Sequence, residues 1–495
     1  MPLGQSKDEK EINLPKSMRG IGFYSSDSIT LWDLKQILDC KLWQTQHQER
    51  QTSISMDNIN EFKELVNTLN VYNNIVSIET SANASKDAAF AAIFYQQIPD
   101  QISPSILGKM YKSSIIYNTP EVRALIEERY SISFEEFTAC LLIFSLHFQQ
   151  AREEAPEDIE RFLTAMDVPN AANLLKIFAP DKNKLQVLAR NVRKVGFGEH
   201  SRSVISENPI LQYKDGKVSA PIPQLIPSFA ENLVVNLPNT PSTLFNDVGK
   251  QFEVYSINIL RAAFPNLDFA SEDNYGSKKH QRDTPDIRLY ESGRLKGIIE
   301  CKNQTLSFDK KFNRKTNTDF DVKSDKIAEG IVQIWRYVEH LHTENKLQEK
   351  LAENISCYVL TGEWWMAGSS KFHSHVFLAA SKIADKESIH KTYRLDVAIV
   401  SSMELDNLAW TCTENEFLEL PSICCKPENF EISPALLAKN YDFGKIRTLG
   451  DPYKDLLYSE NEIISHIGDM ERFMRKLLPK EIQKVPRIFA RNPFE

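Results

Sequence analysis

The segment from residue 284 to residue 302, TPDIRLYESGRLKGIIECK, constrains the fold most, because it places two short apolar runs on either side of a Ser-Gly-Arg turn. Short runs that are rich in β-branched residues and bounded by turn residues predict two neighbouring strands. Residues 266–274 and 354–362 predict two more strands, and the apolar spacing of residues 242–264 and 321–344 predicts helices. The order helix, three strands, helix, strand predicts a mixed α/β sheet with helices on its faces.

Helical periods dominate the chain from residue 29 to residue 195. Thr119 is an expected N-cap before a proline, and Ser133 followed by Glu136 has the pattern of a capping box. The β-branched piece at residues 113–118 also fits a strand. This part of the chain is therefore predicted to be mainly helical or mixed α/β.

Six prolines between residues 196 and 241 predict a linker that lies on the surface, with a small hairpin about Asp215-Gly216. Beyond residue 362, a further helix and a late strand are predicted, and we expect that strand to extend the sheet. The expected segments are a loose N-terminus (1–28), a separate N-terminal domain (29–195), the proline-rich linker (196–241), an α/β domain (242–410) and a C-terminal extension with a basic tail (411–495).

The formal net charge of −8 excludes a uniformly basic nucleic-acid coat protein, but it allows an enzyme with a local basic cleft. The seven cysteines include no CxxC pair, so neither a disulfide framework nor a zinc ribbon is expected. The polar N-terminus has no apolar core of a secretory signal. The most apolar run, residues 139–148, is shorter than the about 20 residues that a bilayer requires. We therefore expect a cytoplasmic protein with no membrane partner.

The two predicted strands bring together residue types that can hydrolyse a phosphodiester. Strand alternation places Glu300 and Lys302 on one face and Cys301 on the other, and Asp286 begins the neighbouring strand. Two carboxylates held close repel one another unless a cation lies between them. Mg²⁺, or alternatively Mn²⁺, meets that need, and the lysine would orient or help deprotonate a water. The competing interpretation is a turn residue at Asp286 and an exposed ion pair on the strand.

The string Pro285-Asp286, thirteen intervening residues and Glu300-Cys301-Lys302 resembles the signature of the PD-(D/E)XK nuclease superfamily. That superfamily includes restriction endonucleases, resolvases and repair exonucleases. Its core order, αβββαβ, matches the predicted order over residues 242–362. The resemblance implies a restriction-endonuclease-like mixed sheet at residues 242–410, with Asp286 and Glu300 as metal ligands and Lys302 as the catalytic lysine.

Two helices carry further matches to this superfamily. Many members have an acid in the helix before the strands, as Glu253 is here, and RecB-like members have a QxxxY signature that Gln333 and Tyr337 resemble. The resemblance implies that Glu253 and Gln333 assist catalysis, and that Tyr337 helps to bind DNA or to fix the lysine. A solvated acid and a packing tyrosine are the competing interpretations.

Two basic stretches flank the trio, SKKHQR before Asp286 and KKFNRK after Lys302. Both are predicted to be loops at the ends of the catalytic strands, where cationic side chains can grip phosphates; the competing interpretation is a solvated loop. The residues proposed to contact nucleic acid in these loops are Lys278, Lys279, Arg282, Lys310 and Lys311.

These features favour a Mg²⁺-dependent endonuclease that acts on DNA in restriction or anti-phage defence, similar to Shedu-like or restriction-type nucleases; cleavage of RNA is not distinguished. Residues 29–195 would serve as a recognition or regulatory domain. The alternative is a catalytically inactive subunit of the same fold that binds nucleic acid or acts as a scaffold. A homodimer is the default expectation. The chain has no GxxxxGK[ST] loop, so a nucleotide-driven step would need an ATPase or another defence-system partner.

Overall fold

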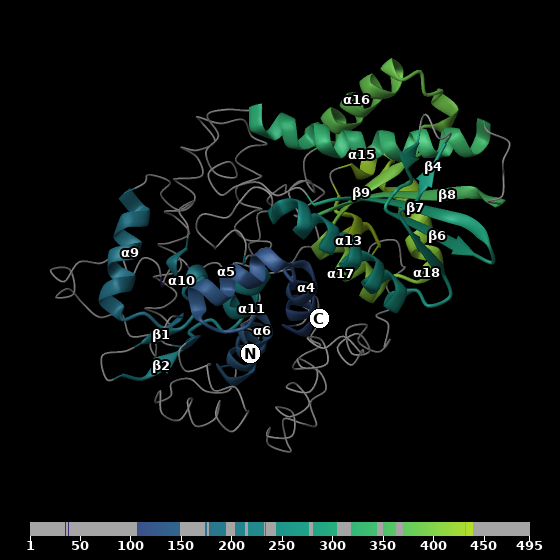
Figure 1. Cartoon of the computed structure of the whole chain (residues 1–495). Helices are drawn as coiled ribbons and strands as arrows, with labels where there is room; N and C mark the ends of the chain where they lie inside the picture. The colour runs from purple at the N-terminus through teal and green to yellow at the C-terminus, as the bar shows by residue number, and fades with distance from the viewer. Residues whose placement is uncertain are drawn as a thin grey trace, which may run out of the picture.

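The main sheet of the described residues is five-stranded and mixed (Figure 1), with the strand order β3-β6-β7-β8-β9. The computed structural model describes residues 106–148, most of 174–233, 244–276, 281–303, 318–343, 350–362, 370–430 and 432–438, together with residues 35 and 38. The strands are β3 (Asp268–Ser271), β6 (Ile287–Glu291), β7 (Arg294–Lys302), β8 (Lys350–Thr361) and β9 (Val397–Ser401).

The first three strands of the sheet form an antiparallel meander. β3 pairs antiparallel with β6, and β6 pairs antiparallel with β7. Ser292 and Gly293 have φ angles of 52° and 71°, and these left-handed conformations close the turn between β6 and β7. β8 then joins β7 in parallel, and β9 joins β8 in parallel. The mixed α/β sheet is therefore confirmed, and the late strand does extend it.

Helices cover both faces of the sheet (Figure 1). The crossover helix α15 (Thr318–Thr343) and its neighbour α16 (Ser370–Lys386) lie on one face. The opposite face is covered by α13 (Leu244–Ala263), α17 (Ser402–Thr411) and α18 (Glu414–Cys424). The alternation of β7 follows these layers, since Ile298 belongs to the core under α15 while Ile299 and Cys301 belong to the core on the α13 face.

The remaining described elements are shorter or lie towards the N-terminus. They are α4 (Ile106–Ile116), α5 (Pro120–Tyr130), α6 (Phe134–Phe148), α9 (Lys182–Lys194), α10 (Val204–Glu207), β1 (Leu211–Gln212), β2 (Val218–Ser219), α11 (Leu225–Glu231), β4 (Asn274–Tyr275), β5 (Arg282–Asp283), η4 (Lys391–Tyr393), η5 (Pro427–Asn429) and α19 (Pro434–Ala438). β1 and β2 pair antiparallel where the small hairpin was expected.

Both helix starts predicted in the N-terminal half are present. Thr119 Oγ1 accepts a hydrogen bond from the backbone N–H of Val122 at 3.3 Å. Ser133 and Glu136 bond reciprocally, as a capping box does. The strand considered at residues 113–118 is wrong, because α4 extends through Ile116. Tertiary packing decides this conformation, since α4 is buried against α11 and α13.

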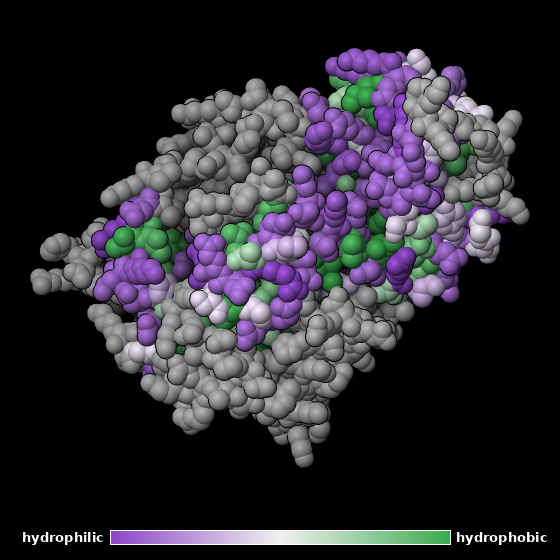
Figure 2. Space-filling model, viewed as in Figure 1, coloured by the Kyte–Doolittle hydropathy of each residue, from purple (hydrophilic) through white to green (hydrophobic). Residues whose placement is uncertain are grey.

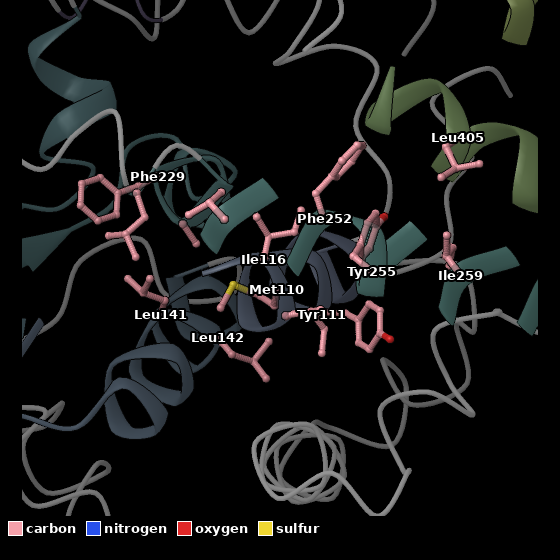
Figure 3. Packing of buried hydrophobic residues seen from close by; sticks show 14 of the residues in the cluster. Met110, Tyr111, Ile116, Leu141, Leu142, Phe229, Phe252, Tyr255, Ile259 and Leu405 are labelled. Atoms are coloured by element: carbon pink, nitrogen blue, oxygen red, sulfur yellow. The ribbon is translucent and has the colours of Figure 1, made fainter. Parts of the chain in front are cut away.

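The N-terminal helices and the sheet share one continuous hydrophobic cluster. Figure 3 shows Met110 and Tyr111 of α4 beside Phe252 and Tyr255 of α13, with Phe229 of α11 nearby. This arrangement differs from the separate N-terminal domain that was expected, because the apolar face of α13 packs against α4 as well as against the sheet.

The segment expected to be a surface linker contains the buried helix α11. Leu225, Ile226 and Phe229 are all buried in it. Pro227 is tolerated because it lies in the first turn, where a backbone N–H has no intrahelical acceptor. The expected boundary at residue 410 also differs from the packing, since α18 lies against β8 and β9.

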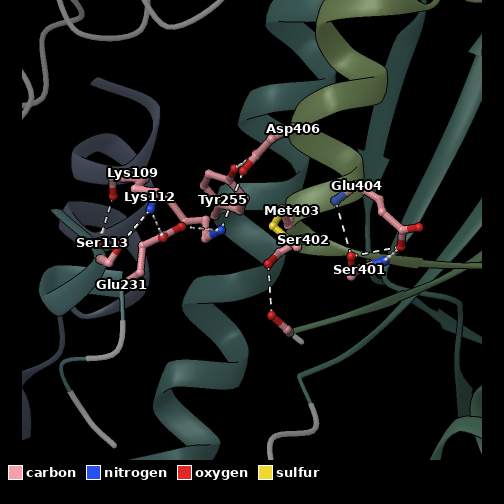
Figure 4. Close-up of polar contacts among 12 residues, drawn as sticks. Lys109, Lys112, Ser113, Glu231, Tyr255, Ser401, Ser402, Met403, Glu404 and Asp406 are labelled. Carbon is pink, nitrogen blue, oxygen red and sulfur yellow. Dashed lines mark hydrogen bonds and ion pairs between the residues drawn. The ribbon is translucent and has the colours of Figure 1, made fainter. Parts of the chain in front are cut away.

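A buried ion-pair network crosses from α4 and α11 to α17 (Figure 4). Lys112 Nζ lies 2.9 Å from Glu231 Oε1 and 3.5 Å from Asp406 Oδ2, while Lys109 Nζ lies 3.2 Å from Glu231 Oε2. Tyr255 on α13 donates its hydroxyl to Asp406. We call Lys109, Lys112, Glu231 and Asp406 the helix-junction network.

Hydrophilic side chains cover most of the described surface over α15 in Figure 2, and apolar side chains form smaller areas. Within the described ranges, no single helix is long and apolar enough to cross a membrane. The pair α5 and α6, bent by 69°, meets that test only when both helices are counted together. All six described cysteines are free thiols.

Candidate active site

The pairing of β6 with β7 brings Asp286 and Glu300 to the same end of the sheet. Ile287 is the register partner of Ile299, so the next residue outward on each strand places Asp286 opposite Glu300. Asp286 Oδ2 accepts a hydrogen bond from the backbone N–H of Cys301 at 2.6 Å. The local sequence explains this register, because the apolar residues of both strands must enter the core between the same layers.

Glu300 and Lys302 lie on one face of β7, as strand alternation predicted. Lys302 Nζ donates to Glu300 Oε1 at 2.5 Å. The Glu300 side chain is 1% exposed and that of Lys302 is 23% exposed, so the lysine lies at an opening and not in a closed interior. Glu300 Oε2 is buried and has no hydrogen-bond partner among the described residues.

Gln333 of α15 completes the surroundings of the lysine. Its Oε1 lies 3.5 Å from Lys302 Nζ, at the long limit of a hydrogen bond. The sequence predicted that Gln333 would assist at this site, and the structure does bring it to the lysine. A long contact of this kind orients the ammonium more than it stabilises the fold.

Glu253 reaches the same end of the sheet from α13. Burial and the charges of Asp286 and Glu272 raise the pKa of Glu253 to about 7, against a weaker opposing effect of Lys302. Glu272, directly after β3, is an acid that the sequence analysis missed. Partial burial and the charges of Asp286 and Asp283 raise its pKa. The signal available for it was an acid inside the predicted strand at residues 266–274.

Acidic groups outnumber the lysine among these described residues. Burial and the charge of Asp286 raise the pKa of Glu300 to about 8. Burial also raises the pKa of Asp286, although the Cys301 N–H and Lys302 oppose this. Burial acts to lower the pKa of Lys302, but Glu300 and Asp286 outweigh it and raise that pKa. We call Glu253, Glu272, Asp286, Glu300 and Lys302 the acid–lysine cluster.

A hard divalent ion fits the donors that this cluster offers. The buried Glu300 Oε2 has no hydrogen-bond partner in the described part of the chain, and Asp286 lies opposite Glu300 in the strand register. Within the described part of the chain, no group of three or more His, Cys, Asp or Glu is arranged to hold a metal ion. Mg²⁺ usually keeps several waters and binds through one or two carboxylates, so two protein ligands meet its needs.

Tyr337 does not occupy the position predicted for a nucleic-acid contact. It is 2% exposed, and its ring packs edge-on against Tyr275 with 5.2 Å between ring centroids. This burial leaves the side chain no surface for DNA, so we assign it a packing role. The Gln-x-x-x-Tyr spacing does place both residues on the sheet-facing side of α15, and Gln333 contacts the lysine.

Of the basic residues predicted to contact nucleic acid, Arg282 is described. It is exposed on β5, which pairs with β4 in a two-stranded sheet beside the main one. This location is compatible with the prediction and does not test it. The other four predicted contacts, Lys278, Lys279, Lys310 and Lys311, lie outside the described residues.

Comparisons of the chain with protein-family models, with curated proteins and with solved structures found no match.

Proposed function

We propose that this chain is a Mg²⁺-dependent endonuclease that hydrolyses phosphodiester bonds in DNA and has a PD-(D/E)XK type of site. The observation that carries the proposal is the convergence of Asp286, Glu300 and Lys302 at one end of the sheet, with a buried carboxylate oxygen that has no hydrogen-bond partner among the described residues. Excess negative charge at a partly open position favours a cation-assisted reaction on an anionic substrate.

Each residue of the site then has a stated role. Asp286 and Glu300 would hold Mg²⁺ or Mn²⁺, and the bound ion would supply a water of lowered pKa and neutralise charge on a phosphate. Lys302 is held by Glu300 and Gln333, and its partly exposed ammonium can orient a water or donate to a phosphate oxygen. Glu253 adds a further carboxylate beside Asp286.

The proposed biological setting is restriction or anti-phage defence, which rests on the resemblance of the sequence motif alone. The N-terminal helices would recognise a trigger or a partner. These helices share a hydrophobic core with the sheet and with α13, which carries Glu253. A change in their position would therefore be transmitted to the site. We propose a homodimer in the cytoplasm, because cutting two strands takes two sites, and an ATPase or another defence-system protein as an additional partner.

A catalytically inactive binding subunit is the second candidate. The closed contact between Lys302 and Glu300 favours it, because the lysine already neutralises one of the two expected metal ligands. The two candidates differ in whether a divalent cation displaces that contact.

Incubation of the purified protein with plasmid DNA tests the proposal. We expect cleavage with Mg²⁺, none with EDTA, and a loss of about 10²–10³-fold in rate for Lys302→Ala. Lys296→Ala is the matched control, because Lys296 lies on the same strand and pairs with Glu291 at 3.0 Å, outside the acid–lysine cluster. If wild-type protein cuts neither DNA nor RNA under any metal condition, the binding subunit is the better account.

A further inference from the structure

Gly330 lies in the interior of α15, where glycine is a costly choice. Glycine destabilises a helix interior by about 1 kcal/mol relative to alanine. A methyl group at this position would lie 3.1 Å from Lys302 Cε, 3.2 Å from Lys302 Cγ and 3.3 Å from Glu300 Cγ. Such contacts are tighter than nine in ten of the contacts that Cβ atoms make in proteins. The aliphatic part of the Lys302 side chain therefore passes α15 at Gly330, the residue of this helix that has no side chain.

The helix cannot easily move away to admit a methyl group. Ile327, Ile331 and Ile334 on α15 are fully buried, and Trp335 Nε1 donates to the backbone carbonyl of Leu395 at 2.8 Å. Protein cores are close-packed, so displacing these side chains would cost more than displacing a partly exposed lysine. An added methyl group would therefore push the Lys302 side chain.

We propose that Gly330 is a positioning residue for the reaction: its missing side chain forms a slot that directs Lys302 Nζ towards Glu300 and Gln333. Gln333 lies three residues further along α15, so the slot and the amide that receives the ammonium share one helix face. This inference rests on the proposed nuclease function for its kinetic consequence, but the slot itself is a property of the fold.

The test compares Gly330→Ala with Gly297→Ala in the full chain. Gly297 on β7 is a matched control for crowding, because a methyl group there would lie 3.3 Å from Leu289 Cβ, away from the acid–lysine cluster. We expect Gly330→Ala to lower kcat for DNA cleavage by about 10-fold with KM unchanged, since a misplacement of about 1 Å can cost 10²-fold and the methyl group displaces the lysine by less. Gly297→Ala should leave kcat unchanged.

A spectroscopic readout separates positioning from catalysis. Reductive ¹³C-methylation labels the lysines, and the Lys302 signal is identified by its absence in Lys302→Arg. We expect that signal to shift in Gly330→Ala and to stay in place in Gly297→Ala. A shift without any wild-type cleavage would support the slot and reject the nuclease; an unmoved signal with unchanged kcat would overturn the slot.

Failure of Gly330→Ala to fold is covered by the double variant. In Lys302→Ala the stem is gone, so alanine at position 330 should be tolerated, and the two substitutions should be strongly non-additive in denaturant unfolding. If Gly330→Ala unfolds the chain in both backgrounds, the crowding does not involve the lysine and the proposal is wrong.

Discussion

The helix-junction network and the acid–lysine cluster both bury charge, but they balance it differently. In the network, two lysines face two acids, whereas in the cluster one lysine faces four acids. Burial acts to raise the pKa of Glu231, but Lys112 and Lys109 outweigh it and hold that pKa below 4.5. The pKa of Glu300 is instead raised to about 8 by burial and by Asp286.

The difference separates a structural use of buried charge from one that needs a ligand. A balanced network stays ionised and fixes how α4, α11, α13 and α17 meet. An unbalanced cluster keeps acids protonated or strained until a cation arrives. Burying charged groups costs free energy in both places. The two uses differ in what compensates the charge: lysines of the protein in the network, and a bound cation in the cluster.

The largest expected effect comes from breaking the balance of the network. Lys112→Met removes the cation that Glu231 and Asp406 share, so both acids would remain buried with less compensation. We expect a loss of about 3–5 kcal/mol in the free energy of unfolding, measured by denaturant titration. Adding Glu231→Gln should recover part of it; a loss under about 1 kcal/mol would show that the network is not structural.

The second prediction concerns Glu300→Gln in the acid–lysine cluster. The substitution keeps the shape of the side chain and removes a charge that the apo site strains, so stability without metal should stay the same or rise. Cleavage of DNA should fall by about 10²–10³-fold, measured with saturating Mg²⁺. Glu291→Gln on β6 is the control, since Glu291 is paired with Lys296 outside the cluster. Equal activity of both variants would reject the assigned ligand.

The third prediction concerns the addition of Mg²⁺ to the protein without any substitution. Mg²⁺ at about one hundred times its dissociation constant should stabilise the wild-type protein by about 2.7 kcal/mol, measured as a shift in thermal unfolding. Glu300→Gln should show a smaller shift, whereas Lys112→Met should retain the full one. Equal shifts in wild type and Glu300→Gln would place the cation elsewhere.

The fourth prediction is that the two charge clusters give opposite slopes of stability against pH in EDTA. The folded pKa of Glu300 is about 8 and its usual value is 4.5, so the folded state binds more protons in that window and stability falls as pH rises. Glu231 has a lowered folded pKa, so its contribution is present above 4.5 and is lost as pH falls. Comparing wild type with Glu300→Gln and Glu231→Gln isolates each slope, and slopes of the same sign would contradict the comparison.

Short-range patterns predicted most of the sheet and part of the site. The runs on either side of Ser292-Gly293 became β6 and β7, and alternation placed Glu300 and Lys302 on one face because strand geometry has a period of two. The helix caps at Thr119 and Ser133 could also be predicted, since the hydrogen bonds of each cap join residues within four positions of one another.

Contacts between residues that are distant in sequence could not be predicted from local patterns. Glu272 joins the cluster because β3 pairs with β6, and Tyr337 is buried in the core between α15 and the sheet, with Tyr275 packed on it. The helix-junction network links residues more than one hundred positions apart, so no local sequence pattern predicts it. α11 likewise is buried by α4 and α6, which overrides the linker-like proline content of its segment.

The sequence by itself determined the order of strands and helices and the face on which Glu300 and Lys302 lie. These depend on backbone periodicity, which is a local property. Only the tertiary structure decided that Gly330 underlies the lysine, that the N-terminal helices share the core of the sheet, and that one buried charge cluster is balanced and the other is not. Packing and electrostatics depend on distances in space, and those exist only once the chain has folded.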